Sequence, residues 1–161
     1  MTATDAGLAV TFPSDTQILI TRDFAAPAGL VYRAWTTPEL IKRWWNAKRG
    51  TVTDVRVDLR VGGTWRYAMA ADAGFEVAFH GEYLEIVPGE RIVSTEVYEG
   101  APDAAAVSTV TFAAIGGGGT RLSILVEHAS KDNRDMHVRS GMEDGLRDAL
   151  DLLAEVAAAG A

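Results

Sequence analysis

The chain has 161 residues, 48% of them hydrophobic, which suits one domain built around one core. Its formal net charge of −7 and the lack of a basic run argue against a nucleic-acid partner, because an acidic surface repels phosphates. Cysteine is absent, which excludes disulfides, thiolate catalysis and cysteine-type zinc sites and leads us to expect a cytoplasmic protein. No apolar run approaches the roughly 18 residues of a membrane helix, so no membrane association is expected.

The first part of the chain is predicted to contain a leader and one strand. Residues 1–16 show neither a signal-peptide pattern nor a clear periodicity, and we expect a flexible N-terminal leader there. A single domain is expected over residues 17–158. Residues 17–24 alternate between apolar and polar side chains, as in a half-buried strand, and Arg22 shares a face with the isoleucines.

Two short amphipathic helices are predicted next. The first opens at Pro27, which suits a first helical position, and its apolar side ends at Trp35. The second has Thr37 as its N-cap and Pro38 at the first helical position, and its apolar stripe ends at Trp45. Both helices therefore need an apolar surface to cover.

A series of strand-like segments follows without helical periodicity between them. Their connections are short and rich in turn residues, which favours antiparallel pairing, because parallel strands need long crossovers. The four glycines 116–119 are interpreted as a hairpin turn, since a strand follows them where a phosphate loop would require a helix. With the first strand, these segments predict a seven-stranded meander: 51–58, 64–71, 75–86, 91–98, 106–115 and 120–128.

The C-terminal residues 133–158 carry the strongest helical pattern, with Asp132 as the expected N-cap. Gly141 and Gly145 lie inside this helix one turn apart. Two interpretations of the glycines stay open, namely a mild kink or a close approach with spare room beside the helix. The apolar face of the helix comprises Met142, Leu146, Ala149, Leu150, Leu153 and Val156.

These elements predict an α+β helix-grip fold, in which a curved antiparallel sheet surrounds a long C-terminal helix. A single helix cannot cover seven flat strands, so the sheet is expected to bend and to enclose an apolar cavity. Trp65, Tyr67 and Met69 share one face of their strand and Arg66 lies on the other. The face with the aromatic residues is therefore predicted to be the buried one. The alternative is that these aromatic residues simply fill a solid core.

Several motifs resemble those of the START-like (SRPBCC) superfamily, whose Bet v-like members share this helix-grip fold. The closest branch is the one related to the C-terminal domain of the activator of the 90-kDa heat-shock protein ATPase. The resemblance covers about residues 17–157, with the motifs in the family's order. They are Phe24-Ala-Ala-Pro27, Val31-Tyr-Arg-Ala-Trp35-Thr-Thr-Pro38-Glu-Leu40, Trp44-Trp45, Val61-Gly62-Gly63-Thr-Trp65, Gly81-Glu-Tyr83-Leu-Glu85-Ile86-Val-Pro88-Gly-Glu-Arg91-Ile92-Val93 and Gly141-Met142-Glu-Asp-Gly145-Leu146.

The resemblance implies a hydrophobic cavity between the sheet and the C-terminal helix, holding a small apolar ligand without any cofactor. A monomer or a weak homodimer is expected. The side chains expected to line the cavity are Trp35, Trp45, Trp65, Tyr67, Met69, Phe79, Tyr83, Phe112, Met142 and Leu146. Possible polar groups of the cavity are Arg22, His80, Glu96 and His128; members of this branch often carry an aromatic residue where this chain has Glu96.

The sequence offers little support for catalysis or for a metal site. Its three histidines lack the spacing of metal-binding motifs, and the Gly-x-Ser-x-Gly motif of serine hydrolases does not occur. The one candidate acid–base pair combines His80 with Glu96 on neighbouring strands. The alternative is that His80 and Glu82 lie on the solvent face, unless a bulge near Gly81 reverses the local alternation. Arg22, together with Arg56 and Arg66, is interpreted as an outer-face charge, with a cavity role for Arg22 kept open.

Three functions are therefore considered. The leading hypothesis is a non-catalytic binding module for a small, mostly apolar ligand. The second is a cyclase or hydrolase that uses a His–Glu pair. The third is a co-chaperone-like domain with a chaperone as its possible partner, which requires an exposed apolar patch.

Overall fold

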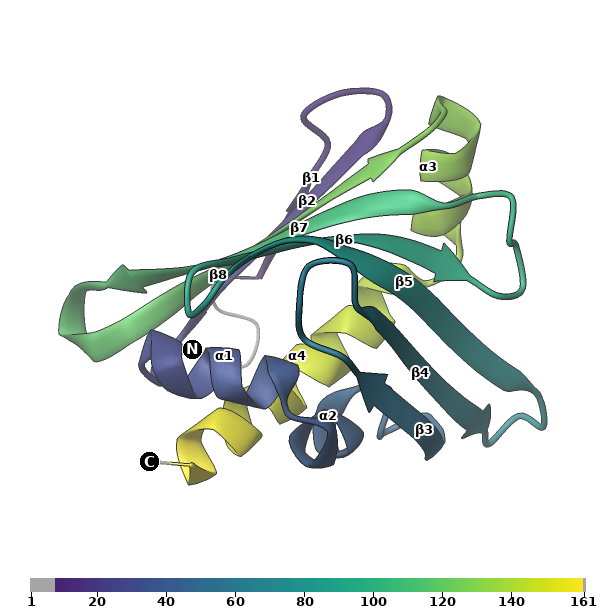
Figure 1. Cartoon of the computed structure of the whole chain (residues 1–161). Coiled ribbons are helices and arrows are strands. Elements are labelled where there is room, and N and C mark those ends of the chain that lie inside the picture. The colour runs from purple at the N-terminus through teal and green to yellow at the C-terminus, as the bar shows by residue number, and fades with distance from the viewer. Residues whose placement is uncertain (1–7, 161) are drawn as a thin grey trace.

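The computed structural model describes residues 8–160, which form one antiparallel sheet with helices packed against it (Figure 1). The strand order is β1-β2-β8-β7-β6-β5-β4-β3. The strands are β1 (Ala9–Thr11), β2 (Gln17–Phe24), β3 (Gly50–Val57), β4 (Thr64–Ala71), β5 (Glu76–Val87), β6 (Arg91–Tyr98), β7 (Ala106–Ile115) and β8 (Gly119–His128). The helices are α1 (Ala28–Thr36), α2 (Pro38–Trp44), α3 (Lys131–Arg139) and α4 (Met142–Ala159).

The α+β class and the antiparallel sheet are confirmed, but the strand number is corrected from seven to eight. The added strand β1 lies within the predicted leader and pairs with β2, where Val10 faces Ile20. Residues 1–7 of the predicted leader lie outside the described residues. The connections from β3 to β8 are the predicted hairpins, including the turn at Gly116–Gly118.

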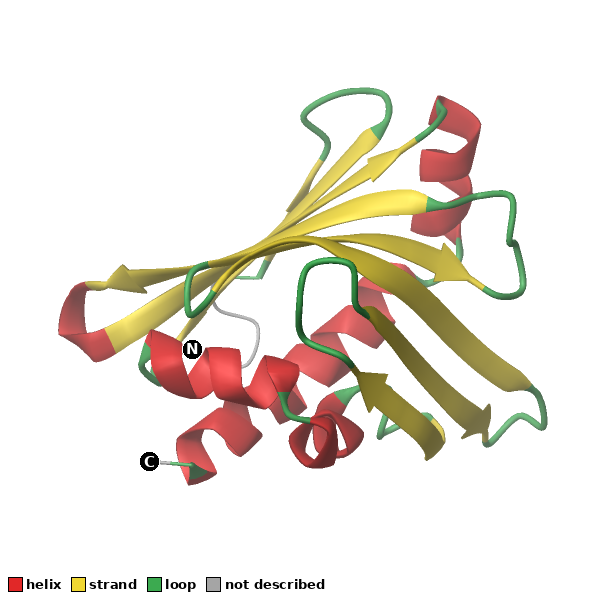
Figure 2. Ribbon diagram, viewed as in Figure 1, coloured by secondary structure: helices red, strands yellow, loops and turns green. Residues whose placement is uncertain are grey.

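The sheet is open, and the chain's first long strand, β2, lies far from β3 in it. β2 pairs with β8, whereas β3 lies at the opposite edge, so α1 and α2 carry the chain across the whole sheet. Figure 2 shows α1, α2 and α4 on one side of the twisted sheet, with β3, β4 and β5 curling toward them. This arrangement gives the sheet an inner face toward the helices and an outer face toward solvent.

The core lies between the inner face and α4. Side chains along β2 alternate between partly and fully buried, and Ile18 is completely enclosed. Leu150 and Leu153 of α4 are also completely buried, so each contributes roughly 2–3 kcal/mol of transfer free energy. The apolar stripe of α4 thus holds the helix against the sheet and against α1 and α2.

The C-terminal helical segment is two helices, which corrects the single predicted helix. Gly141 has a φ of +84°, a left-handed conformation that glycine adopts without the cost of a Cβ, and it separates α3 from α4. The N-cap of α3 is Ser130, whose side chain accepts a hydrogen bond from the Asn133 backbone, and Asp132 lies in the first turn. No helix among the described residues is long and apolar enough to cross a membrane.

Candidate functional site

Five aromatic residues on β4, β5, β6 and at the end of α2 form an inward-facing group, which we call the aromatic cluster. The Trp45 ring contacts those of Tyr67 and Phe79, with centroids 5.5 and 6.1 Å apart, in edge-on geometry. Trp65 lies 4.9 Å from Tyr67, and Tyr98 lies 5.1 Å from Phe79. The cluster therefore joins three neighbouring strands to the helical layer.

The rings of the aromatic cluster are unevenly buried. Trp65 is 8% exposed, whereas Trp45, Tyr67 and Phe79 are half-buried and Tyr98 is 40% exposed. In a filled core phenylalanine is usually fully buried and tryptophan is highly buried on average. The other four residues of the cluster thus retain solvent contact, although those on the strands lie on the inner face of the sheet.

Glu96 is the acidic residue beside this cluster. On β6 the buried residues Ile92 and Ser94 occupy the inner face, and Glu96 is the next residue with the same alternation. Its side chain makes no hydrogen bond or ion pair within residues 8–160. Burial raises the pKa of Glu96 to about 6, and its negative charge also contributes to a raised pKa of Tyr67, after burial of that hydroxyl.

A carboxyl group with a pKa near 6 can exchange a proton or accept a hydrogen bond at neutral pH. The predicted partner for acid–base chemistry is His80, and this pairing is wrong. His80 lies on the outer face, where its Nδ1 is 2.9 Å from Glu99 Oε2. The sheet separates the His80 imidazole from Glu96, because successive side chains of a strand alternate between faces.

The alternation holds at His80 because the irregularity of β5 lies elsewhere. The register of β5 against β6 shifts between Tyr83 and Glu85, after the segment that contains Gly81. Gly81 is nevertheless required, since a Cβ there would overlap the Thr95 carbonyl and the indole Nε1 of Trp65. The bulge near Gly81 that the sequence analysis left open is therefore not present at that residue, and His80 lies on the solvent face, as in the alternative interpretation.

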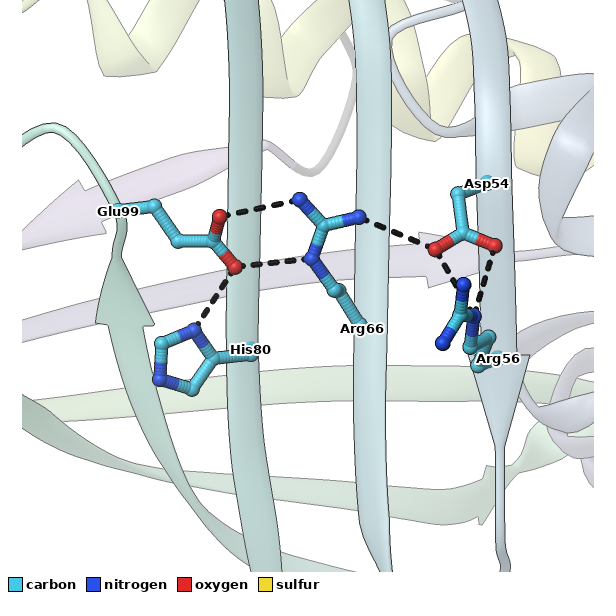
Figure 3. A network of polar contacts seen from close by, with 5 residues as sticks. All are labelled: Asp54, Arg56, Arg66, His80 and Glu99. Carbon is cyan, nitrogen blue, oxygen red and sulfur yellow. Dashed lines mark hydrogen bonds and ion pairs between the residues drawn. The ribbon is translucent and has the colours of Figure 1, made fainter.

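His80 instead belongs to a network of charges on the outer face (Figure 3). Arg66 bridges two carboxylates, donating to both oxygens of Glu99 at 3.0 Å and to Asp54 at 3.1 Å. Arg66 holds the pKa of Glu99 down at about 2, and the His80 contact adds to this effect. The network ties β3, β4 and β5 to the end of β6 and engages Arg66 and His80 on the face of the sheet opposite Glu96.

His128 faces inward, but it lies against another histidine that the sequence did not single out. Its Nε2 is 3.0 Å from Nδ1 of His137 on α3, and its own Nδ1 has no partner. Burial lowers the pKa of His128, and burial together with His128 lowers the pKa of His137 to about 4. Both imidazoles are therefore neutral at pH 7. The two histidines are nine positions apart, which matches no known sequence motif, so their contact could not be predicted from the sequence.

Arg22 is buried, which corrects its interpretation as an outer-face charge, whereas Arg56 and Arg66 lie on the outer face as predicted. The Arg22 Nη1 lies 2.6 Å from Asp151 of α4, and the guanidinium stacks over the Phe24 ring. Arg22 thus faces the interior, and its charge is balanced by α4.

The other predicted cavity residues lie in two places. Trp35, Phe112 and Tyr83 pack into the core, where Trp35 stacks on Trp44 with centroids 4.9 Å apart. Met142 and Leu146 are half-buried at the start of α4, and Met69 is buried at the far end of β4. No trio of potential metal ligands occurs in the described part of the chain.

Two surface hollows lie outside the aromatic cluster. One, of about 460 Å³, lies beside the turn from β5 to β6 and is bordered by Arg91 and Phe112. The other, of about 300 Å³, lies between the loop after β6 and Met136 of α3. Both are shallow and without a group of convergent polar side chains, so neither presents a site for chemistry.

Comparison with known proteins identifies the family. Residues 25–158 match the family described as activator of Hsp90 ATPase homolog 1-like protein. The chain belongs to this family. The expected resemblance to this branch is thereby confirmed. No curated protein matches the chain.

Solved structures of several bacterial proteins share this family member's fold over nearly their whole length. A protein from Rhodobacter sphaeroides is 24% identical, with 94% of this chain and 99% of that chain covered and a TM-score of 0.87. A protein from Chromobacterium violaceum is 30% identical, with coverage of 89% and 98% and a TM-score of 0.74. A Staphylococcus aureus relative at 20% identity, covering 89% and 95% with a TM-score of 0.69, is described as a protein of unknown function.

Proposed function

We propose that this protein binds a small, mostly apolar molecule between the aromatic cluster and the start of α4. The observation that carries the proposal is the incomplete burial of inward-facing aromatic residues, namely Trp45, Tyr67 and Phe79. Apolar side chains that point inward without complete burial leave free energy to be gained when a ligand covers them.

The first turns of α4 form the opposite wall in this proposal. Met142 and Leu146 are half-buried there, and a Cβ added to Gly145 would meet only Arg49, at 3.8 Å. The glycine leaves room beside the helix, and flexible side chains such as methionine adapt readily to a ligand. Binding then requires these side chains to shift, without any change in the sheet.

The test uses N-phenyl-1-naphthylamine, an uncharged apolar probe whose fluorescence rises in a dry site. We expect saturable binding to the intact protein, and Leu146→Trp is expected to weaken it by about tenfold, since the indole would occupy the probe's space. The matched control is Val107→Trp on the outer face of β7, where the side chain is 36% exposed. Absence of saturable binding, or equal effects of the two substitutions, would show the proposal to be wrong.

A chaperone-directed role is the second candidate function, because the family is named after an activator of Hsp90 ATPase. Val61 and Leu84 are 62% and 45% exposed, and the Gly62 amide donates to the Tyr83 carbonyl at 2.9 Å, which brings their segments together. Exposed apolar side chains of this kind suit a partner surface.

The chaperone role is tested by ATPase assays with a purified Hsp90-class chaperone. Stimulation by the intact protein that is lost in the Val61→Ser, Leu84→Ser double variant would support it. Phe75→Ser, at a 57% exposed residue of the loop between β4 and β5, serves as the control. A lack of stimulation by the intact protein would dismiss this role without affecting the ligand-binding proposal.

A further inference from the structure

The unpaired carboxylate of Glu96 bears on the chemistry of the ligand. An ionised carboxylate that is partly removed from water is costly unless a cation or several hydrogen bonds compensate it. Within the described chain, Glu96 has neither. The charges of Arg22 and Arg49 are already neutralised by Asp151 and Asp148 of α4.

The neighbours of Glu96 are neutral. The charge of Glu96 acts on the hydroxyl of Tyr67 on β4, and burial raises the pKa of Tyr67 and of Tyr83 on β5, so both stay protonated. Glu96 stands in register with Ala106 of β7, which in turn pairs with His128 of β8, and the pKa of that histidine is lowered. No described side chain on these elements supplies the missing positive charge.

The aromatic cluster supplies the other half of a cation site. Faces of aromatic rings carry negative potential and attract ammonium groups that lie within about 6 Å of the ring centre. Trp45, Tyr67 and Phe79 meet at centroid separations of 5.5 and 6.1 Å, and Tyr98 continues the group along β6. Several rings of different strands thus converge beside one carboxylate.

The geometry points to a cationic ligand: an amine or quaternary ammonium group held between Glu96 and the aromatic cluster, with its apolar part toward α4. This inference rests on the proposed function and narrows its ligand class. Glu96 excludes carboxylates by like-charge repulsion, while the rings compensate an ammonium group that has lost its water. Ammonium compounds and neutral apolar compounds of equal size should therefore bind differently.

The test compares three probes that share a dodecyl chain and differ in the head group. Dodecyltrimethylammonium, dodecanol and dodecanoate are titrated, below micelle formation, in competition with N-phenyl-1-naphthylamine. We expect the ammonium probe to bind at least about tenfold more tightly than dodecanol, and dodecanoate to bind most weakly. Glu96→Gln should abolish this order, while Glu82→Gln on the outer face should preserve it.

The outcomes separate the two proposals. Equal affinities of the three probes, or an unchanged preference in Glu96→Gln, would overturn the cationic ligand and leave apolar binding standing. Failure of N-phenyl-1-naphthylamine itself to bind would overturn both. Circular dichroism of Glu96→Gln distinguishes a lost preference from a lost fold.

Discussion

At the scale of single residues, environment decides the chemistry of groups that look alike in sequence. Glu96 and Glu99 are three positions apart on β6 and the loop after it, yet the pKa of the first is raised to about 6 and that of the second lowered to about 2. Glu96 faces the helices without a partner, whereas Glu99 lies outside and receives hydrogen bonds from Arg66. Alternation along a strand is enough to separate them.

Glu96 should make stability depend on pH. Its pKa is about 6 in the folded chain and near 4.5 in the unfolded chain. Between these pH values the folded state binds more protons than the unfolded state. The free energy of unfolding therefore falls as the pH rises from 4.5 to 6. We expect Glu96→Gln to raise that free energy at pH 7.5 by about 1–2 kcal/mol, and by much less at pH 4. Urea titrations at both pH values measure this, and equal differences would contradict it.

The His128–His137 contact should produce the opposite dependence. Since the pKa of His137 is about 4 in the folded chain against 6.5 when unfolded, the unfolded chain takes up the proton first as pH falls. The free energy of unfolding should drop by about 3 kcal/mol between pH 7 and pH 4 through this residue. In His137→Gln the decrease should be smaller by that amount; parallel pH profiles of the two proteins would refute the prediction.

At the scale of elements, strong local patterns were predictable and weak ones were not. The strand with Trp65 and Tyr67 shows clear alternation, and its inner and outer faces are as expected. The strand Ala9–Thr11 has only three residues, too few for a period, and it exists because β2 offers a free edge. The split between α3 and α4 depends on the left-handed Gly141, and a glycine in a helical pattern fits a kink or a close approach equally well.

The break at Gly141 can be tested against a helical glycine. Gly141→Ala places a Cβ in a left-handed conformation and should lower the free energy of unfolding by about 1–2 kcal/mol. Gly29 lies within α1, where an added Cβ would meet no atom within 4 Å, and Gly29→Ala should raise that free energy by about 0.5–1 kcal/mol. Chemical denaturation of both variants gives the comparison, and effects of the same sign would contradict the assigned helix break.

At the scale of the whole molecule, contacts between elements far apart in the chain position the site. These contacts could not be predicted from the sequence. Arg22 and Asp151 are separated by 129 positions, so no spacing rule connects them, yet their ion pair joins β2 to α4. The family motifs did predict the overall fold and the inner position of the aromatic residues. They did not predict that Glu96 would lack a partner, because this depends on where all neighbouring charges finally lie.

The Arg22–Asp151 pair should show strong coupling. Side chains of these residues are 6% and 18% exposed, so removing one partner leaves a poorly solvated charge. Asp151→Leu or Arg22→Met alone should lower the free energy of unfolding by about 3 kcal/mol, whereas the double variant should lose much less than the sum. Thermal and urea denaturation of the original protein, the two single variants and the double variant gives a double-mutant cycle. Additive losses of the free energy of unfolding would argue against a buried pair.

The pairing of β2 with β8 also has a consequence for synthesis on the ribosome. Gln17 and its neighbours leave the ribosome early, but Glu127, the partner of Gln17 on β8, follows 110 positions later. Until then β2 can pair only with the short β1, while β3 to β7 can already form their hairpins. The nascent chain therefore carries an exposed apolar strand during most of its translation, and completion of the sheet is a late, non-local step of the kind that slows folding.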